Sequence, residues 1–158
     1  MNLSRNFSLQ ELIKSDTAVR LNIDNNPNAN QIEKLKLLCE NILQPVRDHF
    51  GPVMITSGYR SPDLCLKIGS SITSQHCKAE AVDFECPGKD NAEVCDWVYK
   101  NLDFDQMILE FYVPGEPNSG WCHVSYVPEK GRKQFLRAFK EDGRTKYKPI
   151  IGKAVDLI

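Results

Sequence analysis

Residues 74–84 read SQHCKAEAVDF, and this stretch places a histidine and an aspartate in one short segment that passes from loop to strand. The alternation that follows sends Val82 and Phe84 to one face of the strand and Ala81 and Asp83 to the other. Asp83 therefore projects from a face kept clear by small side chains. The segment predicts a strand with an apolar face for the core and a polar site on the opposite face.

A second segment, residues 121–127, reads WCHVSYV and has the same period of two. Cys122 and Val124 fall on one face, and Trp121 and His123 on the other. Two strands thus offer a carboxylate and an imidazole toward one cleft, and both groups are good zinc ligands, although a carboxylate also suits harder ions. From residue types alone, a lone strand histidine is more often a hydrogen-bonded core residue than a metal ligand.

Other polar residues stand beside these two strands. Residues 53–56 predict a short strand that ends close to Arg60. The guanidinium of Arg60 either forms two parallel hydrogen bonds to a substrate carboxylate or forms an internal salt bridge. Ser74 and Gln75 either contact a substrate or hydrogen-bond locally, as turn-capping side chains do. Trp121 either walls the site or packs. The residues alone leave these alternatives open.

Four motifs, in this order along the chain, resemble those of the zinc D-alanyl-D-alanine carboxypeptidase family: SGYRSP at 57–62, SQH at 74–76, AVDF at 81–84 and GWCHVS at 120–125. The similarity extends from about Phe7 to about Val127. That family also contains phage endolysin L-alanyl-D-glutamate peptidases and the vancomycin-resistance D,D-dipeptidase, with the hedgehog signalling domain as a relative in fold.

The resemblance implies an α+β fold of the hedgehog/DD-peptidase type, in which a small antiparallel sheet carries a zinc site and is flanked by helices. It implies that His76, Asp83 and His123 bind Zn2+ and that Arg60 contacts the substrate. Three protein ligands leave a fourth position open for water, which distinguishes a hydrolytic zinc site from a structural one. We also expect Ser74, Gln75 and Trp121 to take part in substrate binding.

The chain departs from the resemblance at one position. Many members place the catalytic carboxylate three residues before the second histidine, where this sequence has Gly120. Our candidate for the general base is Glu110, because a hairpin register that sets it opposite His123 would place both on one face about 5 Å apart. A slip of one residue would turn Glu110 to the other face. It is otherwise an ordinary strand-end glutamate, and the remaining carboxylates to consider are Glu80, Glu85 and Glu116.

By resemblance, the reaction is hydrolysis of a peptide bond in peptidoglycan stem peptides. The cleaved bond is either D-Ala-D-Ala or L-Ala-D-Glu, since both place a small side chain next to a residue that bears a carboxylate. Two alternatives come from other classes. A zinc-containing binding module with weak or no activity is favoured by Gly120, and a phage structural component would share the fold.

Composition narrows the remaining possibilities. A chain of 158 residues and 18.0 kDa predicts one peptidase-like domain, residues 1–158. A net charge of −1 gives no reason to expect nucleic acid as a partner. No apolar run is long enough for a membrane span, and the N-terminus lacks the apolar segment of a secretory signal. We therefore expect a monomer made in the cytoplasm that acts on the cell wall after release or within a phage particle.

The rest of the chain supplies supporting elements. Helices are expected at 8–14, where Ser8 and Glu11 form a capping-box pattern, and at 16–21, 29–50 and 90–102. The segment 61–72 should hold a short helix followed by a flexible loop at 69–71. Pro45 should bend the long one. Six scattered cysteines with no C-x-x-C pair indicate free thiols. Residues 130–148 are rich in Lys and Arg and predict a strand or extended arm with a basic edge, either simply solvated or suited to an anionic wall polymer.

Overall fold

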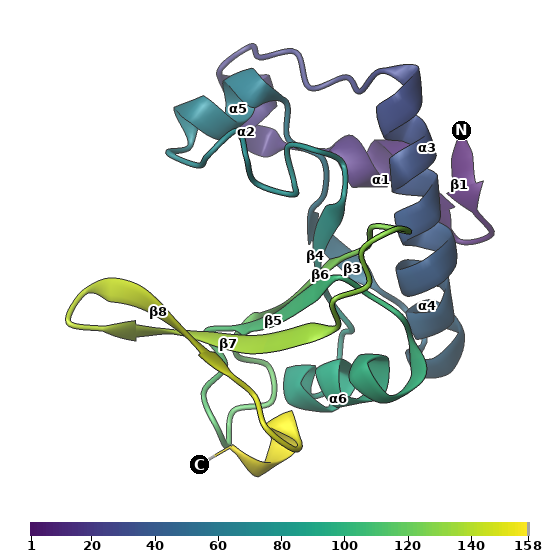
Figure 1. Ribbon diagram of the computed structural model, residues 1–158. Coiled ribbons are helices and arrows are strands. Elements are labelled where there is room, and N and C mark those ends of the chain that lie inside the picture. Colours follow the sequence, from purple (N-terminus) through teal and green to yellow (C-terminus); the bar gives the residue numbers. More distant parts are fainter. Residues whose placement is uncertain (158) are drawn as a thin grey trace.

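The computed structural model describes residues 1–157, and its centre is a mixed sheet of six strands in the order β3-β4-β6-β5-β7-β8. Their bounds are β3 Met54–Ser57, β4 Ala81–Glu85, β5 Gln106–Glu110, β6 Trp121–Ser125, β7 Gln134–Glu141 and β8 Arg144–Pro149. At the N-terminus a two-stranded sheet joins β1 (Asn2–Ser4) to β2 (Phe7–Ser8). The helices α3, α4 and α6 lie on one side of the large sheet, and the hairpin of β7 and β8 extends away from them (Figure 1).

The helices lie close to where the sequence places them. Their bounds are α1 Leu9–Ile13, α2 Asp16–Arg20, α3 Ala29–Leu38, α4 Gln44–Phe50, α5 Pro62–Lys67 and α6 Asn91–Asn101, with a π-helical turn η1 at Cys39–Leu43 and a 3₁₀ turn η2 at Ala154–Asp156. The capping box that opens α1 is confirmed, with Ser8 and Glu11 each bonding the other's backbone N–H. These caps fix the first turn and hence the direction of the helix.

The long helix expected over residues 29–50 is interrupted earlier than predicted. Its turns widen to a π-helix at Cys39–Leu43, and α4 then begins with Pro45 in its first turn. Proline has no backbone N–H to donate to the preceding turn, so a change in the hydrogen-bond pattern before Pro45 satisfies the chain without a break. The three segments still present a continuous apolar face, because Leu35, Leu38 and Val46 are fully buried.

The two faces of the sheet differ as the period of two predicts. Val82 and Phe84 on β4 and Cys122 and Val124 on β6 are completely buried and belong to the core shared with the helices. Asp83 lies between the first two and points to the other face. The helices cover one face with apolar contacts, and the opposite face presents the polar side chains of the same strands.

The α+β fold and the sheet flanked by helices are as predicted, with one difference in topology. Strands β3, β4, β6 and β5 pair antiparallel, but β7 pairs in parallel with β5. The expected antiparallel sheet is therefore mixed. The basic segment that was expected as a strand or arm forms an antiparallel hairpin, with Leu136 opposite Pro149 and Glu141 opposite Arg144. Its distal part extends the sheet beyond the helices.

Within residues 1–157, no helix is both long and apolar enough to cross a membrane. All six cysteines are buried and unbridged in the structure, as the scattered spacing indicated. Cys122 points into the core, and its sulfur lies 3.1 Å from that of Cys95. The thiols are thus core side chains. Among residues 1–157, none of them belongs to the cluster of possible metal ligands on the polar face of the sheet.

Candidate metal centre

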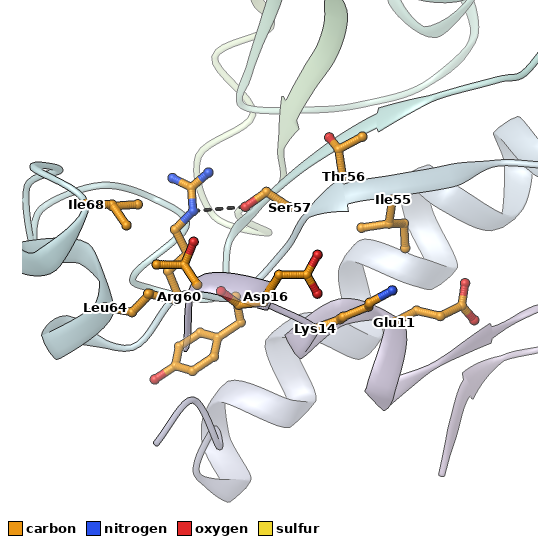
Figure 2. A pocket seen from close by; sticks show the side chains of 12 residues that line it. Glu11, Lys14, Asp16, Ile55, Thr56, Ser57, Arg60, Leu64 and Ile68 are labelled. Atoms are coloured by element: carbon orange, nitrogen blue, oxygen red, sulfur yellow. Dashed lines mark hydrogen bonds between the residues drawn. The ribbon is translucent and has the colours of Figure 1, made fainter. Parts of the chain in front are cut away.

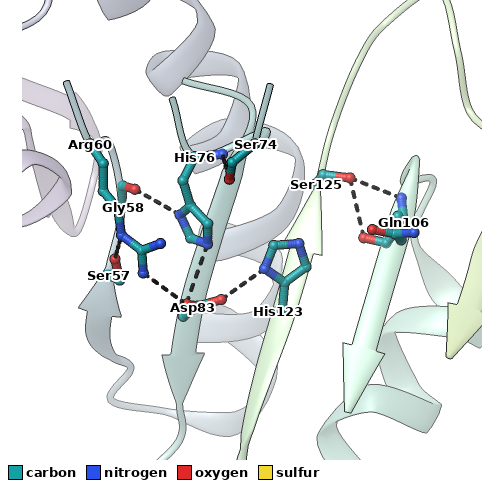
Figure 3. Close-up of polar contacts among 9 residues, drawn as sticks. All are labelled: Ser57, Gly58, Arg60, Ser74, His76, Asp83, Gln106, His123 and Ser125. Atoms are coloured by element: carbon teal, nitrogen blue, oxygen red, sulfur yellow. Dashed lines mark hydrogen bonds and ion pairs between the residues drawn. The ribbon is translucent and has the colours of Figure 1, made fainter. Parts of the chain in front are cut away.

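His76, Asp83 and His123 converge on the polar face of the sheet (Figure 3). One ligand atom from each lies within 4.8 Å of the others, and all three residues are buried. Asp83 and His123 are directly opposite each other on β4 and β6, and Asp83 Oδ1 is 2.9 Å from His123 Nδ1. His76 comes from the loop before β4, with its Nε2 3.3 Å from Asp83 Oδ2. Two imidazoles and one carboxylate are the donor set of many catalytic zinc sites.

The orientation of the His76 ring is fixed by the backbone of another segment. Its Nδ1 lies 2.8 Å from the carbonyl oxygen of Gly58. Since a carbonyl only accepts, Nδ1 carries the proton, and Nε2 is left with a lone pair directed toward Asp83. A histidine held in this way by a backbone carbonyl is the usual arrangement around a protein-bound metal. The residues present therefore fit a divalent ion such as zinc.

Gly58 holds this position because the chain approaches α1 closely there. A Cβ on Gly58 would come within 2.2 Å of the carbonyl oxygen of Leu12, to which Tyr59 N–H donates at 2.7 Å. Only glycine leaves room for that contact without displacing backbone. The first helix thus indirectly positions the carbonyl that orients His76.

Asp83 is held as a carboxylate. Burial is the largest influence on its pKa and acts to raise it, but the adjacent imidazoles of His123 and His76 outweigh burial and bring the pKa well below its usual range. The same oxygens that face the two imidazoles are the ones that a cation would bind. Asp83 is therefore ionised throughout the neutral range and supplies negative charge at the centre of the group.

Arg60 lies at the edge of this group, as its place after β3 predicts. Its Nε donates to Ser57 Oγ at 2.9 Å, and its Nη2 is 3.7 Å from Asp83 Oδ2. The Arg60 backbone N–H also donates to the carbonyl of His76, which ties the two loops together. The guanidinium is partly exposed, so part of its hydrogen-bonding capacity remains available to another carboxylate or carbonyl.

Glu110 faces the same side of the sheet as His123, but the expected register is wrong by two residues. Ile108 is opposite His123, and Glu110 is opposite Trp121. A shift of two preserves the face, so the glutamate stays diagonal to the histidine. Burial raises the pKa of Glu110, and the negative charge of Asp83 raises it further, while His123 and Arg60 act in the opposite direction. The carboxyl is thus electrostatically part of the group.

Comparison with known proteins agrees with this geometry. The family model for peptidase M15 matches residues 5–124, which is most of the chain. This chain belongs to the M15 peptidase family. M15 peptidases are zinc-dependent, which agrees with the donor set of the His-Asp-His group. No curated protein matches the sequence.

The glycine at position 120, where the resemblance led us to expect a carboxylate, has a steric explanation in this chain. Gly120 has φ +67°, and a Cβ there would lie 2.0 Å from the carbonyl oxygen of Glu110 and 2.8 Å from the backbone nitrogen of Tyr112. Phe111, between these two, also has a positive φ, of 55°. The backbones that leave β5 and enter β6 are therefore in contact, and no side chain of any kind fits at Gly120 in this arrangement.

Ser74 and Gln75, two further predicted site residues, have different hydrogen-bond partners in the structure. Ser74 Oγ accepts from the backbone N–H of His76 at 3.2 Å, so its hydroxyl caps the turn next to the group. Gln75 donates its amide to Asp105 at 2.9 Å, and this engages it with a carboxylate that also binds Arg132. Of these two, only Ser74 contacts a residue of the His-Asp-His group.

Trp121 lies on the site face at the end of β6. Its ring centroid is 5.5 Å from that of Phe111, and within residues 1–157 its buried Nε1 has no hydrogen-bond partner. A buried indole N–H without an acceptor is uncommon in folded proteins. Trp121 and Phe111 together form an aromatic wall beside Glu110, since Trp121 pairs directly with that residue.

A cavity of about 410 Å³ borders Arg60 and Ser57 on the side of α1 and α2 (Figure 2). Lys14 and Asp16 contribute opposite charges to its wall, and Leu64 adds apolar surface. Arg60 lines this cavity and also approaches Asp83, whereas His76, Asp83 and His123 are not among the lining residues. The space is within the range of small-ligand pockets.

Three contributors to the site were missed by sequence reasoning. Ser57 and Gly58 lie inside a motif that was recognised, yet their roles as partners of Arg60 and His76 depend on contacts that the sequence does not reveal. Tyr147 on β8 is opposite Ala138, which in turn pairs with Glu110. Burial raises the pKa of Tyr147, and the charge of Glu110 adds to this effect. Ala138 lies between the two larger residues in the strand pairing.

Proposed function

We propose that this chain is a zinc-dependent peptidase in which His76, Asp83 and His123 hold the ion and residues 1–158 act as one domain. The observation that carries the proposal is the convergence of three buried ligand atoms within 4.8 Å on the open face of the sheet. When bound there, zinc polarises a peptide carbonyl and makes water a stronger acid. The remaining steps depend on side chains of the chain itself.

Glu110 is the proposed general base. It accepts the proton of the attacking water and returns it to the leaving amine, the role that a carboxylate of raised pKa performs well near neutrality. Support comes from its position on the site face and from the direction of its pKa, which is set by burial and by Asp83. Glu80 is a weaker candidate because it pairs with Lys34 at 3.1 Å. Glu116 lies in the exposed loop between β5 and β6.

Arg60 is proposed to bind a carboxylate or carbonyl of the substrate. Its Nε is engaged by Ser57, which fixes the guanidinium plane and directs the Nη groups toward Asp83. A planar donor of this kind recognises a carboxylate through two parallel hydrogen bonds. The adjoining cavity, with charges of both signs, would receive the part of the peptide beyond Arg60. Trp121, Ser74 and Gln75 remain proposed contacts at its borders.

The proposed substrate is a peptidoglycan stem peptide, cleaved at either a D-Ala-D-Ala or an L-Ala-D-Glu bond. Membership of the M15 family supports a peptide substrate, and the partly exposed cation at Arg60 favours a bond close to a carboxylate. The alternative of a zinc-containing binding module retains one specific observation in its favour, the glycine at position 120. The two functions differ in whether any bond is broken.

The deciding experiment incubates purified zinc-loaded protein with defined stem peptides and follows new termini by mass spectrometry. Wild-type protein and Glu116→Gln should cleave, and Glu110→Gln should be slower by roughly 10²-fold or more, because a positioned general base contributes about that factor. Glu116→Gln is the matched control, since it makes the same chemical change in an exposed loop. No cleavage by any of the three proteins would support the binding module instead.

A further inference from the structure

The hairpin of β7 and β8 follows the part of the chain that the family model matches, which ends at residue 124. It lies in a segment of unusual charge. Residues 130–153 contain nine Lys or Arg and two acidic residues, whereas the rest of the chain contains eleven Lys or Arg and nineteen acidic residues. The near-zero net charge of the whole chain is therefore the sum of a basic C-terminal segment and an acidic remainder.

The pairing of the hairpin gathers its cations on one face. Arg137 is opposite Lys148, and Phe139 is opposite Lys146. The guanidinium carbon of Arg137 is 5.0 Å from the centre of the Phe139 ring, and Lys148 Nζ is 5.6 Å from it. We call Arg137, Lys146 and Lys148 with Phe139 the basic face. Such cation–π contacts hold long side chains in place at an exposed site.

The basic face is turned away from the proposed active site. Arg137 pairs with Leu109, whose side chain is in the core on the helix side of the sheet, whereas Ala138 pairs with Glu110 on the site face. Neighbouring residues in a strand point to opposite faces, so the cations next to Phe139 cannot reach the metal group. A ligand bound to them would not occupy the cleft.

Little negative charge offsets the basic face. Lys146 lies 3.4 Å from Glu141 in an exposed pair, which contributes little binding energy. Among residues 1–157, neither Arg137 nor Lys148 has an acidic side chain within 4.0 Å. Arg132, by contrast, is bound to the buried carboxylate of Asp105 through two nitrogens. Among residues 1–157, Arg137 and Lys148 are thus free of acidic partners, whereas Arg132 in the same segment forms a structural ion pair with Asp105.

We propose that the basic face of the β7–β8 hairpin binds a phosphodiester-bearing polymer of the cell wall. Alternate residues on a strand are about 7 Å apart, so Lys146 and Lys148 form a short row of point charges suited to a polyanion. The choice of a wall polymer depends on the proposed function. The surface itself depends only on charge and exposure, which are properties of the hairpin alone.

The basic face is less suited to nucleic acid. Single-stranded nucleic acid is bound by cationic grooves with open aromatic rings on which bases stack. The ring of Phe139 is instead in contact with Arg137 and Lys148 of the same surface. Double-stranded DNA is most often read by a helix or a two-stranded ribbon that enters the major groove with polar side chains for the base edges.

The test compares two triple variants of equal charge change. Arg137→Gln/Lys146→Gln/Lys148→Gln removes the basic face, and Lys67→Gln/Lys89→Gln/Lys100→Gln removes three exposed cations elsewhere. Both are sedimented with purified cell walls that carry phosphodiester polymers and with the same walls after acid removal of those polymers. Thermal unfolding of each variant verifies that it is folded, and hydrolysis of a soluble stem peptide is measured in parallel.

We expect wild-type protein and the control variant to bind intact walls, with affinity that falls as salt rises, and the basic-face variant to bind at least about tenfold more weakly with a shallower salt dependence. Soluble-peptide hydrolysis should be unchanged in both variants. Equal binding by the two variants would overturn the proposal, as would equal binding of wild type to stripped walls or tighter binding to single-stranded DNA. Wall binding without any hydrolysis would leave this inference standing and remove the proposed peptidase function.

Discussion

The carboxyl group of Glu110 and the imidazole of His123 project from adjacent antiparallel strands onto the same face of the sheet, offset by two residues in register. The offset places Glu110 beside Trp121 and diagonal to the proposed metal ligand. Because a side chain as long as glutamate can span a diagonal pair, this arrangement supports the proposal that Glu110 acts as the general base in place of a carboxylate at position 120. The base and the ligand are then supplied by different strands.

The acid limb of the pH–rate profile should report Glu110. A general base must be deprotonated, so kcat/KM should fall as pH drops through a pKa above the ordinary glutamate value of about 4.3. Burial is the main cause of the raised pKa, and Arg60 partly counters it. Arg60→Gln should therefore move the acid limb to higher pH, and Arg20→Gln on α2 should not. A limb that stays in place in Arg60→Gln would contradict the assignment.

Zinc content should depend on two of the three histidines. His76→Ala and His123→Ala should each reduce bound zinc well below the level of about one ion per chain expected for the wild type, because each removes one of three protein ligands. The control is His49→Ala, since His49 is stacked on Trp97 at 4.6 Å, outside the site, and should keep its metal. Elemental analysis after dialysis measures the difference. Full zinc content in His76→Ala would reject the proposed ligand set.

Substitution of Gly120 should destabilise the protein. In Gly120→Ala the new Cβ would collide with the backbone of Glu110 and Tyr112 at a residue with positive φ, and the two effects should cost roughly 2–4 kcal/mol. Gly115→Ala is the matched control, because Gly115 has φ +88° but open space around it, and it should cost about 1 kcal/mol. Urea unfolding measures both. Equal losses would mean that the close approach of the two strands is not tight in solution.

Replacement of Arg60 by lysine should weaken substrate binding more than turnover. Lysine keeps the charge but loses the planar guanidinium that can donate two parallel hydrogen bonds. Because one charge-assisted hydrogen bond is worth about 1.5–3 kcal/mol, KM should rise roughly 10- to 100-fold. Ser57→Ala should give a smaller increase, since it frees the guanidinium without removing it. Steady-state kinetics on a soluble peptide separates KM from kcat. A pure loss of kcat would place Arg60 in the chemical step.

Much of the site could be predicted because strand periodicity is local. The faces of Asp83 and His123 follow from alternation within seven residues, and the motif order identified the three candidate ligands before any contact was known. The capping box of α1 is likewise a local pattern. Free thiols followed from the lack of paired spacing. These predictions required no knowledge of how distant segments meet.

The failures concern relations between segments. The register of Glu110 depends on the loop after β5, where Phe111 adopts a positive φ and Gly120 packs against the preceding strand, and neither is visible as a pattern. The parallel pairing of β7 depends on how the chain returns past β5. The hydrogen bond from the Gln75 amide to Asp105, thirty residues further along, is likewise not visible as a pattern, and the role of Gln75 at the substrate stays a prediction. Contacts of this kind arise from tertiary packing, which overrides local preference.

The pairing of β7 with β5 has a practical consequence for shortening this protein. The matched family region ends at residue 124, so a fragment that stops after β6 would seem a natural minimal enzyme. Such a fragment would leave the outer edge of β5 without its partner and uncover Met107 and Leu109, which Phe135 helps to enclose. Unpaired, apolar strand edges recruit strands from other molecules. We expect the truncated form to precipitate, and the C-terminal hairpin to act as a seal that keeps the catalytic sheet from polymerising.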